Sequence, residues 1–171
     1  MAFQSNNDSD IGSLIVQLSD KDGMIRDRAR KKLVKTGKSA VTSLLDALKN
    51  SKIDQVRWEA AKALGAIADK RSIVPFVDAL EDEFEDVTWL AAEALKKAGM
   101  DAWPALLEAL KVKGSKSKLL RDGAHHILKG QKKSGYNELL EKLVRSLEIE
   151  GTLEAIEPAA DEILKKMGKM G

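Results

Sequence analysis

The amino-acid sequence predicts an all-α protein, a right-handed α-solenoid (an α-α superhelix) of about five helix-turn-helix repeats in one domain over residues 10–171. Three observations predict this fold. Leucine and alanine, with 22 and 21 of the 171 residues, are strong helix formers. The apolar residues recur with a helical period and do not alternate as they would in strands. The same apolar pattern also returns at equal spacing from Leu33 to Leu64 and on to Leu95, which indicates an array of repeated units.

The chain begins with a polar segment, residues 1–9, for which we expect a disordered tail. The repeats that follow are predicted over residues 10–38, 39–70, 71–100, 101–134 and 135–168. One helix pair of this length cannot bury its apolar faces alone, so neighbouring pairs should stack into a continuous core.

The first helix of each repeat is marked by apolar residues at i, i+1 and i+4, which share one helical face. The five sets are Leu14/Ile15/Leu18, Leu44/Leu45/Leu48, Phe76/Val77/Leu80, Leu106/Leu107/Leu110 and Leu139/Leu140/Leu143. Pro75 and Pro104 lie just before two of these sets, where a helix begins and the missing backbone N–H costs nothing.

The second helix of each repeat carries a branched apolar residue, then alanine and leucine at intervals of four. The five sets are Ile25/Ala29/Leu33, Val56/Ala60/Leu64, Val87/Ala91/Leu95, Leu120/Ala124/Leu128 and Ile156/Ala160/Leu164. Gly37, Ala68, Gly99 and Gly130 follow the helices at equal spacing, and glycine in this place usually ends a helix in the left-handed conformation. The fifth repeat departs from the pattern, as expected for a unit that caps the core against water.

Residues 54–69, DQVRWEAAKALGAIAD, resemble the second helix of the short HEAT repeats of the PBS-lyase HEAT-like family, and residues 74–80 and 103–110 resemble its first helix. The resemblance covers nearly the whole chain and implies an armadillo-like helical fold; its motif consists of core, cap and turn residues and is specific for the fold but not for function. It also implies that one column of arginines ties neighbouring repeats together through carboxylates such as Asp54. The column holds Arg26, Arg57 and Arg121, and Thr88 interrupts it in the third repeat.

A ridge of large and charged residues should lie opposite the buried stripe, since each helical residue turns by about 100°. In HEAT-like solenoids the second helices line the concave side, so we expect a partner to bind this ridge. Its residues are Asp27, Lys31, Trp58, Lys62, Trp89, Glu93, Lys96, Asp122, His126 and Lys129. Trp58 and Trp89 either anchor a partner, as aromatic residues do at interface hot spots, or pack between repeats.

The sequence holds few residues for catalysis or metal binding. There is no cysteine, and the adjacent His125 and His126 diverge on a helix by about 100°, so they do not chelate one ion easily. Asp122 lies one turn before His126 and could pair with it, but no nucleophilic triad is evident. We therefore predict no catalytic residue, cofactor or metal, and a non-enzymatic scaffold or adaptor that binds another protein or peptide.

Two alternatives come from family resemblance. The first is a bilin lyase or a lyase-accessory protein, which the family name suggests. The second is a DNA-binding protein related to the HEAT-like alkylpurine DNA glycosylases, for which Trp58, Trp89 and Asp122 invite comparison. A net charge of +2, from 29 basic and 27 acidic residues, argues against nucleic acid and anionic membranes as partners.

Two turns carry opposite charge. Residues 81–86 are acidic and residues 111–118 are basic. They are either solvated loops or surfaces that orient a partner or pair one copy with another. No apolar run reaches the roughly 18 residues of a membrane span, the start does not look like a signal peptide, and a cytoplasmic protein without a small-molecule substrate is expected.

Overall fold

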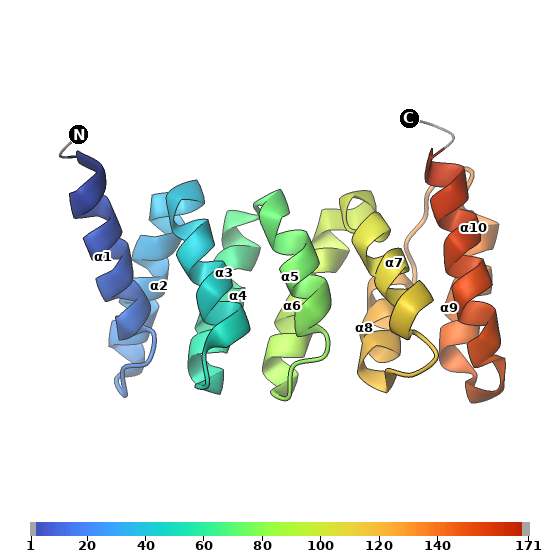
Figure 1. Ribbon diagram of the computed structural model, residues 1–171, viewed down its shortest axis with the longest axis horizontal. Helices are drawn as coiled ribbons and strands as arrows, with labels where there is room; N and C mark the ends of the chain where they lie inside the picture. The colour runs from blue at the N-terminus through green and yellow to red at the C-terminus, as the bar shows by residue number, and fades with distance from the viewer. Residues whose placement is uncertain (1–2, 169–171) are drawn as a thin grey trace.

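The structure, a computed structural model, describes residues 3–168, and these fold into two layers of helices (Figure 1). The helices are α1 (Phe3–Gln17), α2 (Gly23–Thr36), α3 (Val41–Asn50), α4 (Asp54–Ile67), α5 (Ile73–Ala79), α6 (Glu85–Ala98), α7 (Trp103–Lys113), α8 (Lys118–Leu128), α9 (Asn137–Glu148) and α10 (Ile156–Gly168). Short 3-10 helices lie at η1 (Gly37–Ala40), η2 (Lys70–Ser72), η3 (Gly99–Asp101) and η4 (Glu150–Ala155). The described residues contain no strand, so the predicted all-α solenoid is confirmed.

The first four helix pairs stack in register. Helices α1, α3, α5 and α7 form one layer, and α2, α4, α6 and α8 form the other (Figure 1). The core runs without a break between the two layers and contains the predicted apolar stripes, or has them packed against it, except for Ile25. In the second repeat, for example, Val56, Ala60 and Leu64 are all buried. Burial of these faces, about 25 cal/mol for each Å² of apolar surface, supplies the stability that a single pair lacks.

Residues with positive φ follow the second helices where the sequence predicts the helix ends. Gly37, Gly99 and Gly130 have φ angles of 67°, 59° and 78°. Ala68 holds the same place after α4 with a φ of 55°, and it is the one non-glycine residue with positive φ among the described residues. The ψ angles differ, at −133° for Gly37 and −131° for Gly99 against 40° for Ala68, so among these three only Ala68 has the left-handed helical conformation.

The N-terminal helix is longer than the sequence predicts. α1 begins at Phe3, whereas a disordered tail is expected over residues 1–9; residues 1 and 2 lie outside the described residues. The physical reason for the difference is that a helix already nucleated by the buried residues Ile11, Leu14 and Leu18 extends by one hydrogen bond for each further residue fixed.

The last helix pair is reversed relative to the other four. α10 packs on α7 and α9 packs on α8, so the second helix of this pair, not the first, continues the layer of first helices (Figure 1). The first residue of α10, Ile156, lies against Gly114 at the end of α7, and Lys111 of α7 pairs with Asp161 of α10 at 2.9 Å. The sequence predicts a fifth pair in the regular order, and the structure corrects that expectation.

The connection between α8 and α9 explains the reversal. The three earlier links between repeats contain the short helices η1, η2 and η3, which lead the chain directly into the next first-layer helix. Residues 129–136 form an irregular link without such a helix. At its end Tyr136 is buried against Trp103 of α7, with ring centroids 5.7 Å apart and ring planes at 75°, an edge-to-face geometry that aromatic pairs favour.

Candidate partner-binding face

The predicted ridge residues lie on the side of α2, α4, α6 and α8 that is turned away from the core, and we call this side the second-helix face. Nine of the ten are partly or largely exposed and do not pack in the core. Trp58 differs, because its half-buried ring packs against the core and Lys62 Nζ lies 4.4 Å from the ring centroid. The structure therefore divides the two tryptophans: Trp58 is packed, whereas Trp89 is 58% exposed.

Several ridge residues pair with one another or with neighbours. Asp27 pairs with Lys31 at 2.7 Å, and this contact lowers the pKa of the Asp27 carboxyl. Glu93 of α6 and His126 of α8 lie 2.6 Å apart across the repeat boundary. Asp122 contacts Lys118 at 2.6 Å and not His126, so the possible Asp122/His126 pair does not form.

A groove runs between α4 and α6 on this face. Its floor is formed by small and apolar residues, and its rim by charged ones. The lining residues are Ala61, Lys62, Gly65, Leu90, Glu93, Ala94, Lys96 and Lys97. Because Glu93 is engaged by His126, and Lys96 and Lys97 form no ion pair within the described residues, the rim is cationic.

Glu59 is the charged residue of this region that sequence reasoning missed. It is 3% exposed and accepts hydrogen bonds from Arg26 Nε at 3.3 Å, Arg30 Nε at 2.8 Å and Gln55 Nε2 at 3.3 Å. Arg30 also contacts Asp27. The carboxylate of the second repeat is thus enclosed by two arginines of the first repeat. A signal existed in the sequence, since Glu59 lies three residues after Val56 on the buried side of its helix.

Two of the three column arginines, Arg26 and Arg57, tie neighbouring repeats together through carboxylates, as the family resemblance implies, but through Glu59 and Asp82 and not through Asp54. Arg57 binds both carboxylate oxygens of Asp82 in the next repeat, at 2.7 and 2.9 Å, and this contact raises the pKa of Arg57. Asp54, named as an expected partner, accepts a hydrogen bond from the backbone N–H of Gln55. Thr88 donates its hydroxyl to the Glu85 carbonyl within its own helix, so the third repeat lacks the tie.

All three column arginines also bind the turn of their own repeat. Arg26 Nη1 donates to the Asp20 carbonyl at 2.7 Å, Arg57 Nη1 to the Ser51 carbonyl at 3.1 Å, and Arg121 Nη1 to the Gly114 carbonyl at 2.9 Å. Arg121 is itself buried. The shared role of the column is to hold the turn between the two helices of a repeat.

The histidine pair joins three repeats. His125 Nε2 lies 2.7 Å from Glu148 of α9 and lowers the pKa of that carboxyl, while His126 reaches Glu93 of α6. The two rings thus serve different helices. Among the described residues, no group of three or more histidine, aspartate or glutamate side chains is arranged to hold a metal ion.

The turns of opposite charge contact each other within the chain. Lys113 of the basic turn pairs with Glu81 of the acidic turn at 2.7 Å, which lowers the pKa of Glu81 and raises that of Lys113. Asp82 of the acidic turn is occupied by Arg57. Part of the charge of these turns therefore ties adjacent repeats together and is not free to orient a partner.

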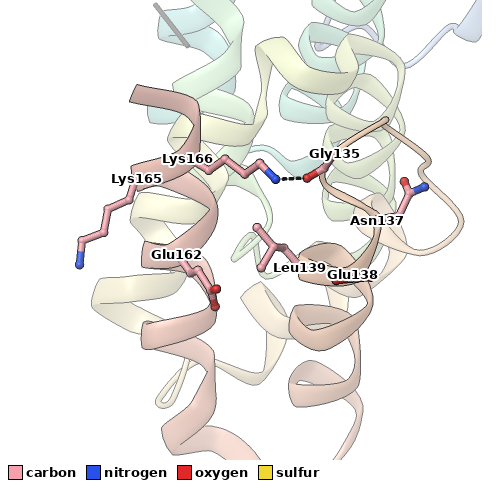
Figure 2. A pocket seen from close by; sticks show the side chains of 7 residues that line it. All are labelled: Gly135, Asn137, Glu138, Leu139, Glu162, Lys165 and Lys166. Carbon is pink, nitrogen blue, oxygen red and sulfur yellow. Dashed lines mark hydrogen bonds between the residues drawn. The ribbon is translucent and has the colours of Figure 1, made fainter. Parts of the chain in front are cut away.

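A second groove, between α9 and α10, carries mixed charges (Figure 2). It is lined by Gly135, Asn137, Glu138, Leu139, Glu162, Lys165 and Lys166. Lys166 donates to the Gly135 carbonyl, and Glu162 is held by Lys142 at 2.8 Å. In Figure 2 the Lys165 side chain points away from the groove. No set of polar groups converges on one point here, so the groove offers no chemistry of its own.

The stacked helix pairs and the exposed second-helix face define an α-solenoid repeat protein. The family model described as HEAT repeats matches residues 11–96 and again residues 41–129. These matches span more than half of the chain, which therefore belongs to the HEAT-repeat family. The matched region ends with α8, before the reversed pair. No curated protein matches the chain. None of the described helices is long and apolar enough to cross a membrane.

Proposed function

We propose that this HEAT-repeat protein is a non-enzymatic interaction scaffold whose second-helix face binds a segment of another protein. The observation that carries the proposal is Trp89, an aromatic side chain left 58% exposed in a chain whose other two tryptophans are packed. Extended surfaces formed by stacked repeats are the usual binding surfaces of solenoids, and tryptophan is among the residues that contribute most at protein interfaces.

The groove between α4 and α6 determines the chemistry of the segment. Its apolar floor at Ala61, Leu90 and Ala94 suits apolar or aromatic side chains, and its rim lysines suit carboxylates. Complementary charge guides association and selects partners. We therefore propose an acidic segment that carries at least one aromatic residue.

The repeats are proposed to be of the short PBS-lyase HEAT-like type, for which the equal and short spacing of Leu33, Leu64 and Leu95 and the motif of residues 54–69 are the support. The cytoplasm is the proposed compartment. No observation favours a bilin lyase, a lyase-accessory protein or a DNA-binding protein over the scaffold.

The test measures binding by fluorescence anisotropy with three probes: an acidic peptide with aromatic residues, its lysine counterpart and duplex DNA. The acidic peptide should bind the unaltered chain. Trp89→Ala and the double variant Lys62→Glu/Lys96→Glu should each weaken that binding at least about tenfold. Trp58 is left intact. Because it packs against the core, its replacement would lower stability, and a loss of binding could not be told from a loss of folding.

The matched control is Val74→Ala, which shortens a 60% exposed apolar side chain on α5, in the opposite layer. It should leave binding unchanged. If Trp89→Ala binds the acidic peptide as tightly as the unaltered chain does, the second-helix face is not the binding surface. If duplex DNA binds in preference to the peptides and its binding weakens with salt, the DNA-binding alternative is favoured.

A further inference from the structure

A small cavity lies at the end of the α4–α6 groove, where α4 and α6 finish beside η2 and α5. Its volume is about 190 Å³, and an apolar cavity of about 150 Å³ is known to hold a benzene ring. The apolar side chains of its lining are Leu64, Ala68, Ile73, Phe76, Ala94, Leu95 and Ala98. Gly65, Ala94 and Lys97 line both the groove and the cavity, so a segment lying in the groove has direct access to it.

Gly65, which lines the cavity, is an unfavourable residue for its position. It lies inside α4, where only proline is a poorer helix former than glycine. The equivalent positions of the preceding and following repeats hold Val34 and Lys96. A Cβ added at Gly65 would meet only the Ala94 Cβ, at an ordinary contact distance of 3.8 Å. Helix packing therefore does not require glycine here, and what the glycine does is leave the cavity entrance open.

Ala68, also in the lining, is a second unfavourable residue. It adopts the left-handed conformation, with φ 55° and ψ 40°, which side chains with a Cβ rarely occupy. The corresponding residues of the neighbouring repeats are Gly37 and Gly99. A glycine at position 68 would remove the methyl group from the cavity wall.

Ser72 is the third such residue. It is buried, lines the cavity, and its hydroxyl has no hydrogen-bond partner. The corresponding residues before α3 and α7 are the buried alanines Ala40 and Ala102, with nearly the same backbone angles. The fold therefore accepts alanine at this place, whereas an unpartnered buried hydroxyl is destabilising. The Ser72 hydroxyl, buried at the wall of the cavity, therefore keeps its hydrogen-bonding capacity unused.

These three residues depart from the repeat pattern, each at some loss of stability, and all three line one cavity. Residues that are poor for the fold and gather at one point indicate a site kept for function. We propose that this cavity is an anchor pocket for one tyrosine side chain of the bound segment; the inference rests on the proposed function. The tyrosine ring fits the apolar lining, and its phenolic oxygen pairs with the Ser72 hydroxyl, which can both donate and accept.

The rim of the cavity favours the same kind of segment. Lys70 and Asp101 pair with each other at 2.9 Å, and Asp69 is held by Arg71, so the acidic residues near the cavity are neutralised. Lys97, shared by groove and cavity, forms no ion pair among the described residues. An acidic residue next to the tyrosine therefore meets a lysine at the entrance.

The experiment uses three acidic pentapeptides that differ only at the central residue, which is tyrosine, phenylalanine or alanine. Their affinities for the full chain are measured by isothermal titration calorimetry. The tyrosine peptide should bind at least about tenfold more tightly than the alanine peptide, and about fivefold more tightly than the phenylalanine peptide because of the Ser72 hydroxyl.

Two variants test the pocket itself. Gly65→Leu fills the entrance without removing a core residue. In this variant the affinity for the tyrosine peptide should fall to that for the alanine peptide. Leucine at the equivalent place of the first repeat, Val34→Leu, is the control and should leave the affinity for all three peptides unchanged. Ser72→Ala should leave the phenylalanine peptide unaffected and remove the preference for tyrosine. Circular dichroism verifies that each variant is folded.

The outcomes separate this inference from the proposed function. If all three peptides bind equally and Lys62→Glu/Lys96→Glu abolishes that binding, the face binds acidic segments and the anchor pocket is wrong. If Gly65→Leu binds the tyrosine peptide as well as the unaltered chain does, the pocket is likewise wrong. If no acidic peptide binds at all, the proposed function and the anchor pocket fail together.

Discussion

At the scale of single residues, Glu59 shows how a charge becomes part of the core. Its carboxylate is 3% exposed, and burial of an unpaired carboxylate would cost several kcal/mol. Arg26 and Arg30 of the preceding repeat and Gln55 of its own helix satisfy both carboxylate oxygens. The interaction therefore forms only when the two repeats are packed in this relative position.

Replacing Glu59 by alanine should destabilise the chain by about 2–3 kcal/mol, because two half-buried arginines lose their partner. Urea unfolding measures the change. Glu93→Ala is the matched control, since Glu93 also pairs across a repeat boundary but is largely solvated, and it should cost at most about 1 kcal/mol. Equal losses in the two variants would show that burial of Glu59 adds nothing.

Asp69 offers a pH-dependent test at the same scale. The Arg71 guanidinium and backbone N–H both bind this carboxylate and lower its pKa from the ordinary value of 3.8 to about 2. A lowered pKa in the folded state means that the contact stabilises the protein above the unfolded pKa, and that this stabilisation is lost as the pH falls from 3.8 towards 2.

Titration of the Asp69 carboxyl carbon by NMR should therefore give a midpoint of about 2. In Arg71→Gln the midpoint should rise and still remain below 3.8, because the backbone N–H continues to donate. Lys38→Gln, which removes the weakest of the contributing charges, should move the midpoint less. A midpoint near 3.8 in the unaltered chain would mean that Arg71 does not hold the carboxylate in solution.

At the scale of the helix pair, the turn and the helix end are held by separate devices. Column arginines bind the turn carbonyls, and a residue with positive φ follows each of the first four second helices. The second repeat deviates because it uses Ala68 where its neighbours use glycine. A Cβ in the left-handed conformation lowers the stability of the fold by roughly 1–2 kcal/mol. Replacement by glycine recovers only part of this stability, because glycine has more conformational freedom in the unfolded chain.

Ala68→Gly should accordingly raise the free energy of unfolding by about 0.5–1 kcal/mol, or the Tm by about 2–4 °C for a chain of this length. Thermal unfolding followed by circular dichroism measures the shift. The exchange Gly99→Ala puts a Cβ at φ 59° and ψ −131°, a conformation that glycine adopts far more readily than alanine, and it should lower the Tm by at least this amount. A fall in Tm for Ala68→Gly would contradict the account of the left-handed helix end.

At the scale of the whole molecule, the reversed last pair closes the solenoid. α10 covers α7, and through it Trp103, Leu106 and Leu110 are fully buried. The sides of α9 and α10 that face away from α7 and α8 carry charged residues such as Glu141, Lys142 and Glu162, which are exposed. A polar outer face of this kind is typical of a repeat that caps a solenoid.

Removal of residues 136–171 should expose Trp103 and the α7 leucines, so we expect a lower Tm, a red shift of tryptophan emission and self-association in size-exclusion chromatography. A point variant gives the same test without truncation. Ile163→Ala removes a fully buried side chain of α10 and should cost about 2–5 kcal/mol, against about 1 kcal/mol or less for the exposed neighbour Glu162→Ala. Unchanged melting and a monomeric truncated chain would show that the last pair is dispensable.

The sequence by itself determined the architecture of the first four repeats. The stripe of Val56, Ala60 and Leu64, its counterparts, and the glycines that end the helices are local patterns, since each depends on the period of one helix and the conformation of one residue. Such patterns place helices and turns without knowledge of their neighbours. They also separated the core side of each second helix from the outward side that carries Trp89.

Only the tertiary structure decided which residues meet. Arg57 pairs with Asp82 and not Asp54, and Glu59 is enclosed by arginines from another repeat. Of the two tryptophans on the second-helix face, Trp58 packs against the core and Trp89 does not. The order of the last helix pair and the cavity beside Ser72 belong to the same group. Each depends on how one repeat is rotated and displaced against the next. Side-chain pairing changes over a few ångströms, whereas the helical period in the sequence is unaffected by such a shift.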